Sequence, residues 1–195
     1  MKQIKYGFHG EDDAHKIFLH NYLQQFDQDD VLFDRDDEFC EKFRAGNKKQ
    51  VDTKFAFVAR EGLSKYQHDI FFVGRDIDSH QANQFKIRQN HFTKERIKNL
   101  ILMLPVQCVE HWLWLLKHRR ENPQSTKNIS FENYHNDRAK IEVYGQKDPP
   151  NELSNPIVYS LSSSLDVSWL ESRSDSFKHF HNQVVQFLQV YSKTD

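Results

Sequence analysis

The stretch of sequence on which the fold depends is Asp69-Ile70-Phe71-Phe72-Val73-Gly74-Arg75-Asp76-Ile77-Asp78. A short apolar run is followed by two aspartates that are one residue apart. Alternate side chains of a β-strand lie on the same face, so Asp76 and Asp78 converge if the strand geometry persists to Asp78. Two converging carboxylates repel each other unless a cation lies between them. The stretch therefore predicts a buried strand with a metal site at its end.

Apolar runs that predict strands alternate with segments of helical spacing along the first part of the chain. The strands are expected at residues 4–8, 30–33, 70–73 and 99–104. This alternation predicts an α/β fold with a mostly parallel sheet flanked by helices. We expect residues 1–120 to form this core and residues 121–195 to form a helical C-terminal extension packed on the same domain.

Two helix starts follow from capping residues. Asp52 and Thr53 are expected to cap a helix whose apolar stripe includes Phe55, and the final helix is expected from about Ser174 onward. The histidine pairs have the wrong spacing for one helix face. We therefore interpret His15, like the histidines at 20, 179 and 181, as a surface or capping residue.

The composition excludes several classes of protein. The 195 residues carry a formal net charge of -1, so there is no global basic field for binding nucleic acid, and any such contact needs a local patch or a partner chain. Two cysteines without zinc-site spacing make neither a disulfide framework nor a zinc site. The sequence has no Gly-rich phosphate loop, so an ATPase is not expected. We expect a cytoplasmic protein with no signal peptide and no membrane partner.

Acidic residues follow the predicted strands, where ligands of open parallel sheets gather. Glu11, Asp12 and Asp13 follow the first strand, Asp76 and Asp78 follow the third, and a later apolar helix carries Glu110. Carboxylates that converge from separate strands are typical of Mg²⁺ or Mn²⁺ sites. The metal ligands that we predict are Asp76, Asp78 and Glu11.

Each of these acidic groups also has a purely structural interpretation. Glu11 and Asp12 are suited to complement the dipole of the helix that follows them. Glu110 lies in an otherwise apolar helix, where a buried acid needs a partner. A structural ion pair and a functional role for Glu110 are both left open.

The motifs together resemble a TOPRIM domain, the fold shared by topoisomerases, primases and OLD-family nucleases. That family places Glu-Gly-x-x-Asp after its first strand and Asp-x-Asp after a later one. The matching residues are His9-Gly10-Glu11-Asp12-Asp13 and Asp76-Ile77-Asp78. His9 stands where the family carries its glutamate.

The chain is most similar to small stand-alone bacterial TOPRIM-like proteins, which are related to OLD nucleases. These share an Arg-Asp-x-Asp motif, a Glu-x-Trp on a later helix, a downstream lysine and a terminal Ser-Phe-x-x-Phe. The chain has, at the corresponding places, Arg75-Asp76-Ile77-Asp78, Glu110-His111-Trp112, Lys140 and Ser176-Phe177-Lys178-His179-Phe180. The resemblance covers most of the chain.

The resemblance implies a Mg²⁺- or Mn²⁺-dependent nuclease that acts on DNA or RNA in anti-phage defence, beside an ABC-type or OLD-type ATPase. In this interpretation the metal ligands hold one or two ions, Glu110 orients a ligand and Lys140 contacts phosphate. The residues expected to act in catalysis are His9, Glu11, Asp13, Glu110 and Lys140.

Two alternatives stay open. One is a catalytically degenerate interaction module that keeps the fold and binds the ATPase. The other is metal-assisted hydrolysis or transfer on a small phosphate compound. A homo-oligomer is compatible with each of them.

Overall fold

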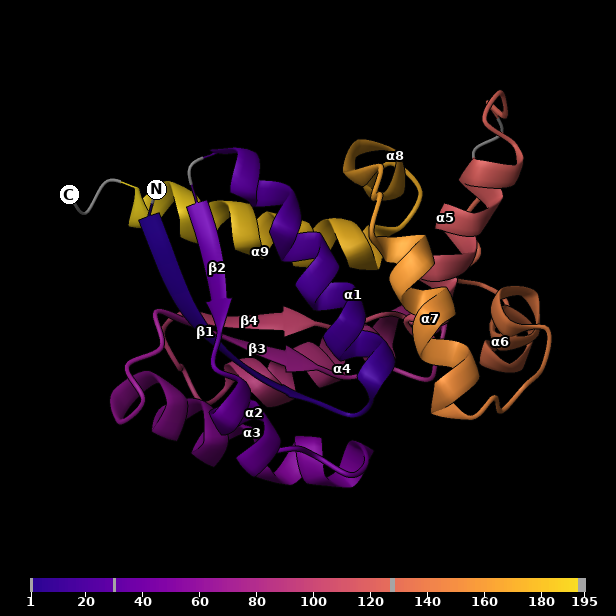
Figure 1. The fold of residues 1–195 in the computed structure, drawn as a ribbon. Coiled ribbons are helices and arrows are strands. Elements are labelled where there is room, and N and C mark those ends of the chain that lie inside the picture. Colours follow the sequence, from indigo (N-terminus) through magenta and orange to yellow (C-terminus); the bar gives the residue numbers. More distant parts are fainter. Residues whose placement is uncertain (1, 30, 127–128, 193–195) are drawn as a thin grey trace.

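The sheet of this protein has four parallel strands in the order β2-β1-β3-β4 (Figure 1). The structure is a computed structural model that describes residues 2–29, 31–126 and 129–192, with the side chains of residues 27–29 and 82 left aside. The parallel α/β architecture predicted from the sequence is confirmed. The strands are β1 (Lys2–Gly10), β2 (Val31–Arg35), β3 (Ile70–Gly74) and β4 (Leu100–Met103).

Helices follow each of these strands and then continue to the end of the described chain. A 3-10 helix, η1 (Gln24–Asp29), extends the first of them. In the described ranges the α-helices are α1 (Asp13–Leu23), α2 (Asp37–Lys42), α3 (Lys48–Ser64), α4 (Ala82–Thr93), α5 (Glu110–Glu121), α6 (Asn136–Tyr144), α7 (Asn151–Ser162), α8 (Val167–Glu171) and α9 (Asp175–Tyr191). None of them is both long and apolar enough to cross a lipid bilayer.

The helices lie on both faces of the sheet (Figure 1). Helices α1 and α9 cover one face, and α2 and α3 cover the other, with α4 beside α3. Helices α5, α6 and α7 pack against one another beyond the end toward which β3 and β4 point. The carboxyl ends of the strands therefore face a layer of helices rather than open solvent.

The C-terminal helix α9 contributes to the same hydrophobic core as the strands. Phe177 and Phe180 are fully buried, and their rings lie 5.4 and 6.0 Å from the ring of Trp112 in α5. The indole N–H of Trp112 donates a hydrogen bond to Ser176 Oγ at 2.9 Å. Large aromatic side chains bury much apolar area per residue, so these contacts hold α9 against α5.

The two predicted helix starts have different outcomes. The final helix begins close to Ser174, as predicted: Ser174 is the N-cap of α9, and its side chain accepts the N–H of Phe177. The predicted cap at Asp52 and Thr53 is wrong: α3 begins at Lys48, and Asn47 accepts the N–H of Gln50 at 3.0 Å. Asparagine is as good an N-cap as aspartate and comes earlier in the chain, so the helix starts there.

The free edge of β4 is closed by a side chain instead of another strand. The amide of Gln183 in α9 accepts the N–H of Leu102 and donates to the Leu102 carbonyl, both at 3.0 Å. A glutamine side chain thus makes the two hydrogen bonds that a neighbouring strand would make. Because Leu102 is buried, these backbone groups have little access to water.

We expect Gln183→Ala to lower the free energy of unfolding by about 1–3 kcal/mol, because it leaves the buried N–H and carbonyl of Leu102 unpaired. Urea denaturation followed by circular dichroism measures the change. Gln186→Ala is the matched control, since Gln186 lies on the same helix and is exposed. An equal loss in the two variants would contradict this account of the sheet edge.

Candidate metal centre at the carboxyl end of the sheet

The site is built where β1 and β3 end side by side. Gly10 and Gly74, the last residues of the two strands, are register partners. Glu11 and Asp12 follow Gly10, and Asp12 is the N-cap of α1 because its Oδ1 accepts the N–H of His15 at 3.0 Å. The acidic residues after β1 are thereby fixed next to the end of β3.

His15 connects the two strand ends. Its imidazole is fully buried, with Nδ1 2.8 Å from Asp12 Oδ1 and Nε2 3.0 Å from Asp76 Oδ1. The prediction of a surface or capping histidine is therefore wrong for His15. Burial lowers the pKa of His15, but the charges of Asp12 and Asp76 outweigh that effect and raise it well above its ordinary value. His15 is thus a buried cation between two carboxylates.

Gly74 makes the space that His15 occupies. A Cβ atom at this position would lie 2.9 Å from the ring of Phe8 and 3.2 Å from Cδ2 of His15. Both distances are shorter than ordinary van der Waals contact, so a larger residue would displace the imidazole or the phenyl ring. Two glycines at the ends of two predicted strands are the sequence signal that would have indicated a buried side chain here.

Asp76 lies in the centre of the site, with 5% of its surface exposed. Its Oδ1 accepts the N–H of Val109 at 3.1 Å in addition to contacting His15. Val109 directly precedes α5, so the positive end of that helix dipole points at the carboxylate. Within the described chain both contacts use Oδ1, which leaves Oδ2 for a ligand.

Asp78 takes a different direction from Asp76. Its φ of 57° is in the left-handed region, so the strand geometry does not persist as far as the predicted convergence required. The carboxylate instead pairs with Lys48 and lies 3.2 Å from Arg75 Nη1. Arg75 is itself buried and also contacts Asp52 at 3.3 Å. Asp78 is therefore neutralised by cations of the chain itself.

Glu11 is the least compensated acid of the site. Only 6% of its side chain is exposed, and no group of the described chain makes a hydrogen bond to its Oε2. The closest cationic atom is Arg75 Nη1, at 3.7 Å. Burial and then the charge of Asp76 raise the pKa of Glu11 to about 9. A bound cation would provide the positive charge that this carboxylate lacks.

One group of residues in the described chain has the spacing of a metal site. Ligand atoms of Glu11, Asp12 and His15 lie within 4.8 Å of one another. Asp76 adjoins this group through His15, whereas Asp78 does not belong to it. The structure therefore groups one predicted ligand, Glu11, with Asp12 and His15, and places a second, Asp76, beside this group through its contact with His15.

A polar cavity of about 180 Å³ lies next to this group, between α1, α5, α6 and α7. Glu110 and Lys140 both line it, as do Asp12 and Asp13. Glu110 is buried and accepts a hydrogen bond from the hydroxyl of Tyr144 at 3.2 Å. Burial, with the charges of Asp76 and Asp12, raises the pKa of Glu110. Glu110 is thus a candidate proton donor beside the metal centre.

Asp13 and His9 have other partners. Asp13 pairs with Arg44 at 3.0 Å and with Lys16 at 3.2 Å. His9 points to the opposite face of the sheet from His15, where its Nδ1 donates to the Phe43 carbonyl at 2.8 Å. Burial lowers the pKa of His9, so its imidazole is neutral. Its buried Nε2 has no hydrogen-bond partner in the described chain.

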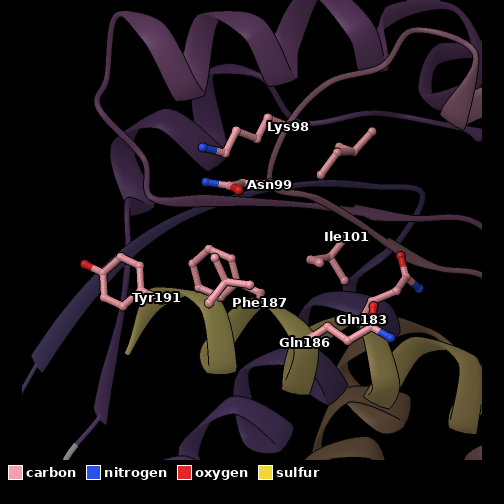
Figure 2. Close-up of a pocket in the computed structure, with 9 residues that line it drawn as sticks. Lys98, Asn99, Ile101, Gln183, Gln186, Phe187 and Tyr191 are labelled. Atoms are coloured by element: carbon pink, nitrogen blue, oxygen red, sulfur yellow. The ribbon is translucent and has the colours of Figure 1, made fainter. Parts of the chain in front are cut away.

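A larger groove, of about 560 Å³, lies at the other end of β4, between the start of that strand and α9 (Figure 2). Ile101 and Phe187 line it together with glutamines and Lys98. Its described lining has no carboxylate that could bind a metal ion. The acidic group around Glu11 is therefore the better candidate for catalysis.

Comparisons of the chain with protein-family models, with curated proteins and with solved structures find no match. The four-stranded parallel α/β architecture is established by the structure itself.

In the metal-free protein, we expect the wild type to lose stability as the pH rises, and we expect Glu11→Gln not to show this loss. The pKa of about 9 in the folded protein lies above the ordinary 4.5, so the unfolded chain releases this proton first. Stability conferred by the proton is complete below pH 4.5 and is lost as the pH rises toward about 9. The stability of Glu11→Gln relative to wild type should therefore increase over this range.

Urea unfolding in EDTA, at about pH 5 and at about pH 9, measures this difference. Glu121→Gln is the control, because 60% of the Glu121 side chain is exposed. A difference between Glu11→Gln and wild type that stays constant over the range would show that Glu11 has an ordinary pKa.

Proposed function

We propose that this protein is a divalent-metal-dependent nuclease of TOPRIM type. The observation that carries the proposal is the Glu11 carboxylate, which is buried close to Asp76 and Asp12 and whose Oε2 has no hydrogen-bond partner among the described residues. Mg²⁺ and Mn²⁺ prefer such oxygen ligands, and a divalent charge would offset the repulsion among the three carboxylates. The residues present thus fit the ion that the resemblance implies.

In the proposed site, Glu11 and Asp76 hold the ion, and Asp12 lies beside it. Asp78, the third predicted ligand, would first have to exchange its partners Lys48 and Arg75. A bound divalent ion activates water and stabilises negative charge on a phosphodiester. Two of the predicted catalytic residues, His9 and Asp13, have other partners in the structure and are assigned no step.

The residues around the polar cavity supply the remaining functions. Lys140 is half-buried in its wall, where its ammonium group can neutralise a phosphate oxygen. Burial and nearby acids raise the pKa of Glu110, which favours the protonated form that can donate to a leaving oxygen. Tyr144 orients the carboxyl group of Glu110 through its hydrogen bond.

A nucleic acid has a positively charged route to the site. An open hollow of about 520 Å³ is lined by Glu11 and by Asn47, Lys48 and Lys49 at the start of α3. Lysines and a helix N-terminus attract phosphate groups. This local patch supports a DNA or RNA substrate although the whole chain carries a net charge of -1. The resemblance to OLD-related proteins adds the proposal of an ATPase partner in anti-phage defence.

A second candidate function is a non-catalytic interaction module that binds such an ATPase. It is favoured by one observation: His15 and Arg75 are cations of the chain that already neutralise Asp76 and Asp78. A site that is compensated in this way is stable without a metal ion. The two candidates differ in whether the protein binds Mn²⁺ through Asp76.

We expect the wild-type protein to bind Mn²⁺ and to cleave DNA or RNA, and Asp76→Asn to lose both properties. Loss of a ligand should weaken Mn²⁺ binding by more than the roughly 10–100-fold that an outer-shell change costs. Isothermal titration measures the affinity, and a gel assay with single- and double-stranded substrates measures cleavage. Asp37→Asn is the control, because Asp37 lies in α2 and its side chain is exposed.

The outcomes separate the two candidates. Mn²⁺ binding that needs Asp76, together with cleavage, supports the nuclease. No Mn²⁺ binding by the wild-type protein, and no cleavage alone or with an ATPase partner, would leave the interaction module as the better account.

A further inference from the structure

We propose that His15 is a positioning residue that sets the orientation of the Asp76 and Asp12 carboxylates toward a bound cation. This inference rests on the proposed function, because it assumes that the carboxylates hold a metal ion. It concerns a side chain that the sequence resemblance does not include. The evidence is the arrangement of the two carboxylates around one buried imidazole.

The imidazole holds the two carboxylates by one oxygen each. Asp12 uses Oδ1 for both the backbone N–H and the Nδ1 of His15, at 3.0 and 2.8 Å. Asp76 uses Oδ1 for His15 Nε2 and for the Val109 N–H. Within the described ranges, no contact reaches the second oxygen of either group. One oxygen of each carboxylate is thus fixed by the protein and the other is left for a ligand.

The His15 side chain makes more contacts than are needed to cap α1. The imidazole has no exposed surface, and it lies against Gly74, where a Cβ atom would approach its Cδ2 to 3.2 Å. The N-cap of α1 is already satisfied by the backbone N–H of His15. The contact between Nε2 and Asp76 therefore adds nothing to capping, but it limits how the Asp76 carboxylate can rotate.

His15 is suited to positioning rather than to binding the ion directly. A histidine ligand offers a nitrogen lone pair to the metal, and its other nitrogen usually donates to a carboxylate or carbonyl. Here both ring nitrogens face carboxylate oxygens within 3.0 Å. Nδ1 is hydrogen-bonded to Asp12, whereas Nε2 contacts Asp76 as an ion pair and makes no hydrogen bond in the described chain. A metal ion would reach Nε2 only by displacing the Asp76 carboxylate.

Two substitutions separate positioning of Asp76 from a general structural role. An asparagine side chain reaches about as far as Nδ1 of histidine, and a glutamine side chain reaches about as far as Nε2. His15→Asn therefore keeps a partner for Asp12 and loses the contact with Asp76. His15→Gln keeps a partner for Asp76 and loses the contact with Asp12. Each variant removes one of the two contacts.

We expect His15→Asn to weaken Mn²⁺ binding by about 10–100-fold, the usual cost of losing an outer-shell partner. His15→Gln removes the same positive charge but retains the contact that orients Asp76, so it should bind Mn²⁺ more tightly than His15→Asn by about 10–100-fold. His179→Asn is the control: it also loses a side-chain contact, with Gln89, on a different helix. Isothermal titration with Mn²⁺ and urea unfolding are measured on all four proteins.

A spectroscopic measurement on the wild-type protein tests the same proposal without a variant. Electron spin echo envelope modulation of bound Mn²⁺ detects a directly coordinated imidazole nitrogen. We expect no such nitrogen, because His15 contacts the carboxylates and not the ion.

The failure of this inference can be distinguished from failure of the proposed function. No Mn²⁺ binding by the wild-type protein overturns the metal site and, with it, the role of His15. Mn²⁺ binding by wild type with equal losses in His15→Asn and His15→Gln overturns only the positioning role, as does unchanged affinity in His15→Asn. A coordinated nitrogen in the wild-type spectrum would make His15 a ligand instead.

Discussion

The arrangement of this protein's site depends on one buried charge interaction, in which His15 lies between Asp12 and Asp76. Burying the Asp76 carboxylate away from water is costly unless a cation and hydrogen bonds compensate it. The His15 imidazole provides this compensation, and it also joins the start of α1 to the chain segment after β3. The N–H of Val109 brings the start of α5 to the same carboxylate. Three elements from distant parts of the sequence are thereby held at one edge of the sheet.

Charge compensation is uneven across this edge, and the unevenness locates the candidate metal centre. Asp78 has Lys48 and Arg75 as partners, and Asp13 has Arg44 and Lys16. In the described part of the chain, the closest cationic atom to Glu11 is Arg75 Nη1, at 3.7 Å, and Oε2 of Glu11 has no hydrogen bond. Added positive charge would stabilise the protein most at Glu11. The polar cavity with Glu110 and Lys140 adjoins the same group of acids through Asp12.

The same charges explain why two functions compete for this site. A nuclease uses carboxylates to hold a cation, whereas an interaction module needs only a stable fold. The cationic side chains of His15 and Arg75 are compatible with both functions, because they pair with Asp76 and Asp78 whether or not a metal ion is bound. The polar cavity and the cationic hollow at the start of α3 are features that a purely structural edge does not require. They are the reason for placing the nuclease first.

Much of the architecture followed from local sequence, because buried parallel strands need continuous apolar runs and helices need a repeating apolar face. The position of β3, the Ser174 cap and the placement of Asp76 at the sheet edge were predictable in this way. By itself the sequence determined the α/β class and a concentration of acids after two strands. Only the tertiary structure decided which acids meet, which are neutralised by Arg75, and that His15 is buried between two of them. Those outcomes depend on side chains distant in the sequence and on the left-handed turn at Asp78, and local patterns contain no information about either.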